Sequence, residues 1–458
     1  MKKTLIALAV TTACANAFAQ SRGPEADESL TKGPTRVQLY GIADVGVESA
    51  HNGYTLTRVS SGISAGSRLG IRGTEDLGGG YRAVFVLEQR IEMDTGDNTN
   101  TSAYQCGTSG CPGVTSPGPA ALQTAVQATA ANLLSRATSV NSVKAPFDRQ
   151  AFVGLVTPVG AVLLGRQYTP GYEVMNRFSA FADATAGQLG QGYAALMIRA
   201  NNAVQYRAEL NGFVASLMYS FGGTELARNE LSGNKNPFYG ANFQYLSPTF
   251  SAGIGYNQNY TQVFDLTTAF STPAMTQDKK KGMQTINAGA SYSFGDIKVF
   301  GQYMKRKNDN PVLTESGLAT VVSAGSTLAN QSLALMLGNG LSQLDADLIR
   351  GSVGKTDTQI YSVSANYQIS TGSVLASCTR AKDKASPGEG ELDAIVDHFA
   401  VAYFHDLSRR TQLYGVAALA KNKGDARMGL GAAGYSGGFT SEPGQDSRVI
   451  QLGIRHAF

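Results

Sequence analysis

Arginines are the residues whose type and spacing most clearly suggest chemistry in this chain. In the segments SRLGIRG and IRANNAVQYR, Arg68 and Arg72 share one side of an alternating pattern, and so do Arg199 and Arg207. A guanidinium group keeps its proton at any physiological pH, so these residues supply permanent positive charge rather than acid–base catalysis. The chemistry expected of them is electrostatic and local.

Histidines give no indication of catalysis. The chain has four, His51, His398, His405 and His456, and they lie on distant segments. No G-x-S-x-G elbow and no pair of histidines at metal-binding spacing is present. His398 and His405 have opposite parity on one predicted strand, so they cannot cooperate simply. The sequence therefore predicts no enzyme activity, no metal and no other cofactor.

The composition argues against a nucleic-acid-binding protein and against a helical membrane protein. The formal charge of the 458 residues is +4, and loss of Lys2 and Lys3 with a leader would leave +2, which is too weak to indicate nucleic-acid binding. The longest uncharged stretches, 98–135 and 316–344, are interrupted by Gly, Ser and Asn, whereas a spanning helix needs roughly twenty mostly apolar residues. Membrane spanning by helices is not expected.

The beginning of the chain indicates export. Lys2 and Lys3 precede an apolar run and the small-residue site Ala17-Phe18-Ala19, which predicts a signal peptide over residues 1–19. The mature protein is expected to leave the cytoplasm.

The cysteines are consistent with export. Cys106 and Cys111 close the loop CGTSGC, where a local disulfide is expected in an oxidising compartment, and metal binding by two lone thiols is the alternative. Cys378 is expected to be a small apolar residue on a strand.

Alternation with a period of two runs from residue 36 to the end of the chain. In YRAVFVLEQR at 81–90, apolar residues on one side oppose Arg82, Glu88 and Arg90 on the other. Parity likewise places Asp44 and Glu48 on the polar side of the first segment. Seven short turns alternate with eight longer links, which predicts sixteen strands. The final segment RVIQLGIRHAF ends on Phe458.

A sheet with one face in hydrocarbon can leave no edge unpaired, because each unbonded N–H or C=O there costs several kcal/mol. The pattern therefore predicts an all-β protein, a 16-stranded antiparallel transmembrane β-barrel with a polar lumen. A soluble sandwich or propeller also alternates, but its apolar faces would have to pack together, and strict alternation of short and long links is not expected of it.

Several segments in order resemble one family. They are VQLYGIADVGVE at 37–48, SRLGIRGTEDLGGG at 67–80, DRQAFVGL at 148–155, GRQYTP at 165–170, IRANNAVQY at 198–206, YFHDLSRRTQLYG at 403–415 and the closing IRHAF. Together they resemble the general porins of Gram-negative, especially β-proteobacterial (neisserial and Burkholderia-type), outer membranes. The resemblance implies a homotrimer in the outer membrane, in contact with its lipid and lipopolysaccharide. It also implies an inward-folded third loop, here residues 168–197, and Phe458 as a terminal assembly signal.

The resemblance also assigns a pore constriction. Arg68, Arg72, Arg166 and Arg199 lie on motifs that in this family direct guanidinium groups into the narrowest part of the lumen, and Arg207 extends the track. Opposing carboxylates are expected from the third loop. The acids of that loop are Glu173 and Asp183, and pairing with Arg177 inside the loop is the alternative. Arg166 shares parity with Val162 and Leu164, so an inward Arg166 would place this apolar pair inside unless Gly165 permits a bulge or this strand packs against the folded-in loop.

Three segments depart from the family pattern: a polar extension at 20–35 before the barrel at 36–458, and long external loops at 92–147 and 307–355. The first long loop is expected either to latch a neighbouring subunit or to be a surface insertion. The predicted function is passive diffusion of ions and small hydrophilic solutes with a modest anion preference. A solute-specific channel and a loop-mediated adhesin or receptor on the same barrel are the alternatives.

Overall fold

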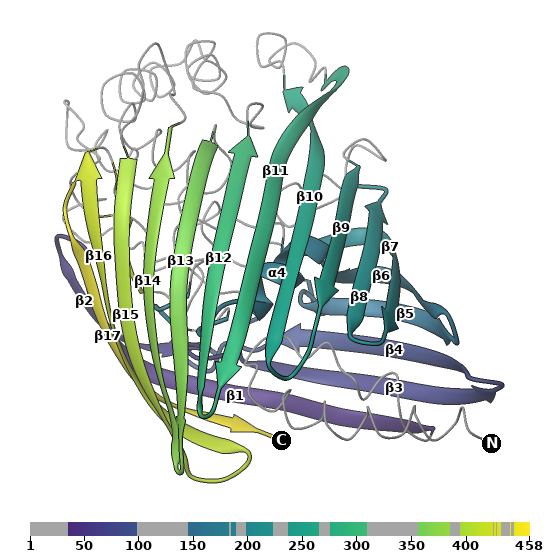
Figure 1. Ribbon diagram of the computed structural model, residues 1–458, viewed down its shortest axis with the longest axis horizontal. Helices are drawn as coiled ribbons and strands as arrows, with labels where there is room; N and C mark the ends of the chain where they lie inside the picture. Colours follow the sequence, from purple (N-terminus) through teal and green to yellow (C-terminus); the bar gives the residue numbers. More distant parts are fainter. Residues whose placement is uncertain are drawn as a thin grey trace.

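The structure, a computed structural model, describes residues 35–98, 145–182, 185–188, 198–222, 237–264, 275–308, 356–384, 394–424, 426, 428–431, 440 and 444–458. One antiparallel sheet contains all the strands of these segments and curves round into a barrel (Figure 1). The predicted signal peptide, the two long loops, Cys106, Cys111 and Asp183 lie outside the described residues.

The barrel wall is built from consecutive hairpins. Its first half comprises β1 (Arg36–His51), β2 (Thr55–Ser61), β3 (Arg68–Gly78), β4 (Tyr81–Arg90), β5 (Gln150–Thr157), β6 (Gly160–Tyr168), β7 (Arg199–Leu210), β8 (Phe213–Ser220) and β9 (Phe238–Tyr245). Its second half comprises β10 (Phe250–Phe264), β11 (Met275–Phe294), β12 (Ile297–Asn308), β13 (Thr356–Ile369), β14 (Gly372–Asp383), β15 (Ala394–Asp406), β16 (Thr411–Gly424) and β17 (Ser447–Ala457).

The first and last strands close the sheet. β1 pairs with β17, and the N–H and C=O of Gly41 exchange hydrogen bonds of 3.0 and 3.1 Å with the C=O and N–H of Phe458. Both β2 and β3 pair with β1. The first half of β1 pairs with β3 and its second half pairs with β2, so β2 and β3 together occupy one position in the wall. The predicted closed sixteen-stranded barrel is confirmed.

One strand differs from its predicted bounds. The sequence predicts a single strand at 64–74, whereas the wall position is filled by β2 and β3 with residues 62–67 between them. Asp44 explains the interruption, because its carboxylate accepts hydrogen bonds from the backbone N–H groups of Ser64 and Ala65. These two N–H groups are thereby satisfied without a neighbouring strand.

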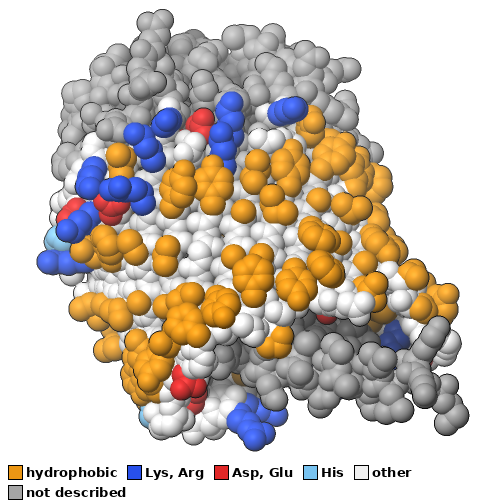
Figure 2. Space-filling model, viewed as in Figure 1, with side chains coloured by type: hydrophobic (Ala, Val, Ile, Leu, Met, Phe, Trp, Pro, Cys, Tyr) orange, Lys and Arg blue, Asp and Glu red, His pale blue; other side chains and the backbone are white. Residues whose placement is uncertain are grey.

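The outer surface of the barrel is apolar. Val37, Leu39 and Val363 are 71, 61 and 66 % exposed, while Gln38 and Tyr40 on the opposite face are half-buried and Ser364 is buried. Figure 2 shows hydrophobic side chains spread over the outside of the wall as a band. Aromatic rings contact one another across neighbouring strands on this surface, as do Tyr219 and Tyr239, whose ring centroids are 5.2 Å apart. An apolar band carrying aromatic rings is the surface that a bilayer requires.

The link after β6 turns into the barrel. Its helix α4 (Pro170–Arg177) begins with proline in the first turn and packs against β9, β10 and β11. Asn257 Oδ1 accepts a hydrogen bond from the Gly171 N–H at 3.0 Å, and Asn287 Nδ2 donates to the Gly171 carbonyl at 2.8 Å. Farther along, Gln451 accepts from the Ala186 N–H at 2.9 Å. The third loop is therefore folded inward, as predicted.

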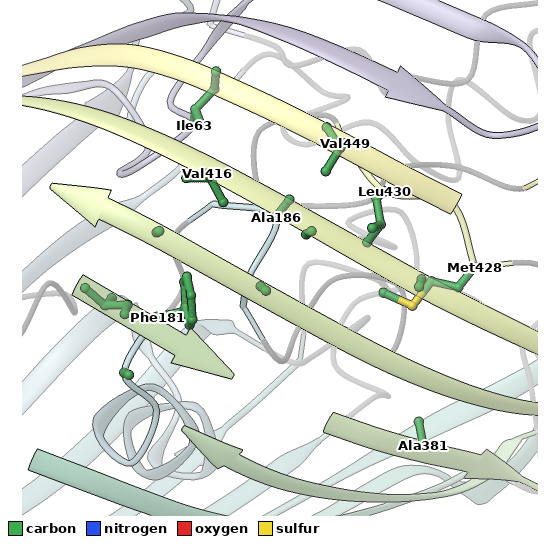
Figure 3. Packing of buried hydrophobic residues seen from close by; sticks show 14 of the residues in the cluster. Ile63, Phe181, Ala186, Ala381, Val416, Met428, Leu430 and Val449 are labelled. Atoms are coloured by element: carbon green, nitrogen blue, oxygen red, sulfur yellow. The ribbon is translucent and has the colours of Figure 1, made fainter. Parts of the chain in front are cut away.

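A group of apolar side chains also lies inside the barrel. Phe181 and Ala186 of the third loop are in one buried cluster with Val416 of β16, Val449 of β17 and Ile63 (Figure 3). Met428 and Leu430, from the link between β16 and β17, belong to the same cluster. This packing fixes the far end of the inward loop against the wall. Among the described residues, no helix is long and apolar enough to cross a membrane.

Candidate functional site

Arg72 lies on the lumen side of β3, directly opposite Gln38 of β1. Its Nε and Nη2 donate hydrogen bonds to Gln38 Oε1 at 3.2 and 3.0 Å. The guanidinium carbon is 4.8 Å from the centroid of the Tyr40 ring, a cation–π distance. Two different partners therefore orient this arginine along the inner wall.

Glu88 of β4 connects several of the surrounding groups. Its Oε2 accepts a hydrogen bond from the Tyr40 hydroxyl at 2.9 Å and lies 3.9 Å from Arg68 Nη1. Its Oε1 accepts from Arg149 Nε at 2.7 Å. The sequence places Glu88 on the polar face, but neither its role nor Arg149 and Tyr40 were predicted. Residues 148–155, DRQAFVGL, already carried the family resemblance, which is the signal that could have identified Arg149.

Tyr168, at the end of β6, joins the wall to the inward helix. Its hydroxyl accepts hydrogen bonds of 3.0 Å from Arg149 Nη2 and from Arg199 Nη2. Its ring lies 4.6 Å from the Arg199 guanidinium carbon and stacks on Tyr172 of α4, with centroids 5.3 Å apart. Arg199 is only 1 % exposed, so it supplies charge from behind Tyr168.

Arg166 is oriented by a bulge. The pairing of β6 with β7 shifts between Gly165 and Gln167, and Gly165 has a φ of 131°. Val162 and Leu164 are exposed on the outer face. Beyond the bulge, Arg166 Nε donates to the Asp148 carbonyl at 2.6 Å, and Nη1 donates to Asn201 Oδ1. The bulge at Gly165, one of the two arrangements that the sequence allowed for an inward Arg166, is present.

Arg207 and Glu173 form a separate pair. Arg207 Nη1 lies 2.9 Å from Glu173 Oε2, which also accepts a hydrogen bond from Asn242 Nδ2 at 2.9 Å. This carboxylate of α4 is thus bound to the wall at β7 and β9. Burial, followed by the charge of Arg207, lowers the pKa of Arg177 in the same helix, while Glu173 acts in the opposite direction. Asp183, the other predicted acid, is not among the described residues.

Asp148 ties further arginines to the same region. Arg90 Nε lies 3.1 Å from Asp148 Oδ2, and Arg90 Nη1 lies 3.2 Å from Glu92 Oε1. Arg90 also stands directly opposite Arg68 in the pairing of β3 with β4. We call the connected set the arginine cluster: Arg68, Arg72, Arg90, Arg149, Arg166 and Arg199, with the carboxylates Glu88, Glu92 and Asp148.

Counted over the described residues, six guanidinium groups against three carboxylates give the arginine cluster a net charge of three positive units. Such a surplus beside a water-filled passage attracts anions and repels cations. Within the described part of the chain, no group of three or more His, Cys, Asp or Glu residues could hold a metal ion. The permanent charge of the guanidinium groups makes the chemistry of this wall electrostatic.

Comparison with known proteins finds one matching family and several similar proteins. The family described as Gram-negative porin matches residues 4–425. Outer membrane porin protein 32 of Delftia acidovorans is 28 % identical over 471 residues, which cover all of both chains. Major outer membrane protein P.IB of Neisseria meningitidis serogroup B is 34 % identical over 100 residues, 20 % of this chain and 25 % of that protein.

Solved structures show the same fold. An anion-selective porin from Comamonas acidovorans has a TM-score of 0.62 and 25 % sequence identity, and the match covers 93 % of this chain and all of that one. OmpT of Vibrio cholerae, in its trimer form, has a TM-score of 0.56 at 13 % identity over 93 % of this chain and all of that one. The resemblance stated from sequence is thereby confirmed, and so is the outer-membrane location. The chain belongs to the Gram-negative porin family.

Proposed function

We propose that this porin forms a water-filled channel through which ions and small hydrophilic solutes diffuse passively, with a modest preference for anions. The observation that carries the proposal is the arginine cluster on the inner wall, with six guanidinium groups and three carboxylates. Guanidinium groups do not lose their protons at physiological pH, so the surplus charge is permanent.

Individual residues are assigned different parts in this function. Arg68 and Arg72 are partly exposed and act on passing ions directly, whereas Arg199 is buried and contributes field from behind Tyr168. Arg166 extends the positive wall, and Arg207 anchors the inward helix through Glu173. Because Glu173 already contacts Arg207 and Asn242, its charge opposes the arginine cluster less than a separate carboxylate would.

The relatives support the same proposal. The similar solved structure from Comamonas acidovorans is described as an anion-selective porin. OmpT of Vibrio cholerae is described in a trimer form, and we propose a homotrimer for this chain as well. The proposed partners are ions, small hydrophilic solutes and the lipids of the outer membrane, with no nucleic acid, metal or cofactor. Phe458, hydrogen-bonded to Gly41, is proposed as the terminal assembly signal.

Single-channel recording tests the pore itself. Purified protein added to a planar bilayer in concentrated KCl should give stepwise, long-lived current increases of ohmic character, in groups of three if the trimer inserts as a unit. An adhesin that uses the barrel only as a scaffold has no need for conductance. The proposed function would be contradicted by protein that gives no current steps although its heat-modifiability on gels shows that it is folded.

A further inference from the structure

Four glycines of the wall lie under the helix of the third loop. They belong to β9, β10 and β11, the strands against which α4 packs, and Figure 1 shows α4 beside β10 and β11 inside the barrel. We call these glycines the glycine seat: Gly240, Gly253, Gly255 and Gly289. Glycine weakens a strand, and it often marks a place where other atoms approach the backbone closely. The contacts of α4 show what approaches the wall at these positions.

The first half of α4 rests on two of these glycines. A Cβ at Gly240 would lie 2.7 Å from Pro170 Cδ. A Cβ at Gly255 would lie 2.9 Å from Gly171 Cα and 3.0 Å from Val174 Cγ2. Carbon atoms in ordinary contact are about 3.5–4.0 Å apart. A side chain at either position would therefore need space that α4 already occupies.

Phe178, which directly follows α4, lies on the other two glycines. Gly253 and Gly289 stand opposite each other in the pairing of β10 with β11. A Cβ at Gly253 would lie 2.9 Å from Phe178 Cε2, and a Cβ at Gly289 would lie only 2.4 Å from Phe178 Cβ. Phe178 is 1 % exposed, so its side chain fills the space above this pair of glycines.

The third loop continues along the same side of the barrel. The Ala180 N–H donates a hydrogen bond of 3.0 Å to Ser364 Oγ of β13. Ser377 Oγ of β14 donates a hydrogen bond of 3.3 Å to the Gly187 carbonyl. The described residues of the loop thus follow the inner wall beyond the glycine seat.

The glycine seat lies across the barrel from the arginine cluster. β11, which carries Gly289, is eight steps from β3 in both directions round the wall, through β4 to β10 or through β1 and β17 to β12. β3 carries Arg68 and Arg72. Anything that lifts the loop from its seat therefore narrows the passage between the loop and these arginines.

We propose that the glycine seat sets the width of the pore, and that Gly289 and Phe178 are the residues that determine this width most directly. The glycines act by position, because the absence of side chains lets the loop lie close against the wall. The inference rests on the proposed function, since it assigns a size limit to the same water-filled channel. It is independent of the anion preference.

The size of the effect follows from the contact at Gly289. To reach an ordinary carbon contact, a methyl group there and Phe178 Cβ would have to separate by about 1 Å or more. The backbone of β11 is paired with β10 and β12 on its two sides, so the loop is the part that moves. We therefore expect the loop to shift toward the arginine cluster by about this distance.

Single-channel conductance of G289A in a planar bilayer tests the proposal. We expect the conductance to be about one third lower than in wild type, because the passage is narrowed. The control G301A should conduct as wild type, because a Cβ at Gly301 of β12 meets nothing within 4 Å. G253A places its methyl group against the side chains of Phe178 and Gln244, should show a smaller decrease, and serves as the test if G289A does not fold.

Uncharged sugars separate the width of the pore from its charge. In liposome swelling, G289A should slow the entry of a disaccharide more than the entry of a pentose, whereas G301A should slow neither. A loss of stability alone would not change the ratio of the two rates.

The variant F178G shows whether the effect passes through Phe178. Glycine at this position removes the three atoms that lie nearest to a Cβ at Gly289, which are Cβ, Cγ and Cδ2 of the phenylalanine. In the F178G background, G289A should therefore leave the conductance unchanged. The four proteins form a double-mutant cycle.

Three results would overturn the proposal. The first is equal conductance of folded G289A and G301A. The second is an equal decrease with and without F178G, because the effect would then not pass through the loop. The third is increased conductance in G289A, which would show that the loop leaves the wall instead of moving inward. Each of these results requires a conducting wild type, whereas folded wild type without current steps would contradict the proposed function itself.

Discussion

Glu88 Oε1 accepts a 2.7 Å hydrogen bond from Arg149 Nε, although the two residues are 61 positions apart in the chain. Both side chains are nearly inaccessible, at 3 and 1 % exposure. An ion pair in such a position is costly to break, because removal of one partner leaves the other charge buried and uncompensated.

Replacement of Glu88 is therefore expected to destabilise the barrel. E88A should lower the free energy of unfolding in detergent by about 3–5 kcal/mol, measured by urea titration with circular dichroism. The control E75A removes an exposed carboxylate from β3 and should change it by less than about 0.5 kcal/mol. Equal stability of E88A and E75A would show that the pair does not hold the arginine cluster together.

Gly165 is expected to tolerate no side chain. Its φ of 131° disfavours L residues, and a Cβ there would lie 2.2 Å from the Ala151 carbonyl oxygen. G165A should lower the unfolding temperature and the yield of folded barrel, with a cost of at least about 1–3 kcal/mol. G301A is the matched control, because a Cβ at Gly301 meets nothing within 4 Å. A fully stable G165A barrel would refute the requirement for the bulge beside Arg166.

The position of α4 should depend on two asparagines. N257A/N287A removes the side chains that bind Gly171 and Thr169, with three hydrogen bonds of 2.8 to 3.0 Å. Because each bond contributes about 1 kcal/mol, the helix should loosen from the wall. Single-channel conductance and current noise should both rise. The control N366A, which removes a lumen-side amide of β13, should leave the conductance and the noise unchanged. Unchanged conductance and noise in N257A/N287A would show that the position of α4 does not control the pore.

The anion preference should not vary with pH between about 7 and 9. The positive charge comes from guanidinium groups, which keep their protons throughout this range. Reversal potentials in a KCl gradient at several pH values in this range should therefore coincide. A preference that disappears as the pH rises toward 9 would assign the selectivity to groups other than arginine.

The wall of the barrel could be predicted because its signal is local. Alternation, short turns and the final strand ending at Phe458 each appear within about ten residues, and the structure places strands at all sixteen predicted positions. The division into β2 and β3 was missed. It depends on the carboxylate of Asp44, some twenty residues away, which satisfies the backbone of Ser64 and Ala65.

The site could be predicted only in part. Parity and resemblance identified Arg68, Arg72 and Arg207 as inward residues, and Gly165 as the condition for Arg166. Of the acids expected from the third loop, Glu173 pairs with Arg207 and Asp183 lies outside the described residues. Glu88 of the wall, which lies next to Arg68 and Arg149, was not predicted. The contact between Glu88 and Arg149 depends on the packing of β4 against the chain just before β5. No pattern of neighbouring residues in the sequence predicts such a contact.

The most direct test of the central claim is the reversal potential of the purified porin in a planar bilayer separating 0.1 M and 1 M KCl, about a tenfold gradient. The sign of the potential should show chloride to be more permeant than potassium. R68Q/R72Q should bring the potential toward zero, because one charge about 6 Å from an ion in water alters its local concentration roughly threefold before screening. The control R409Q/R410Q, in the short turn between β15 and β16, should match wild type. A cation-selective wild-type channel, or a preference unchanged in R68Q/R72Q, would contradict the account.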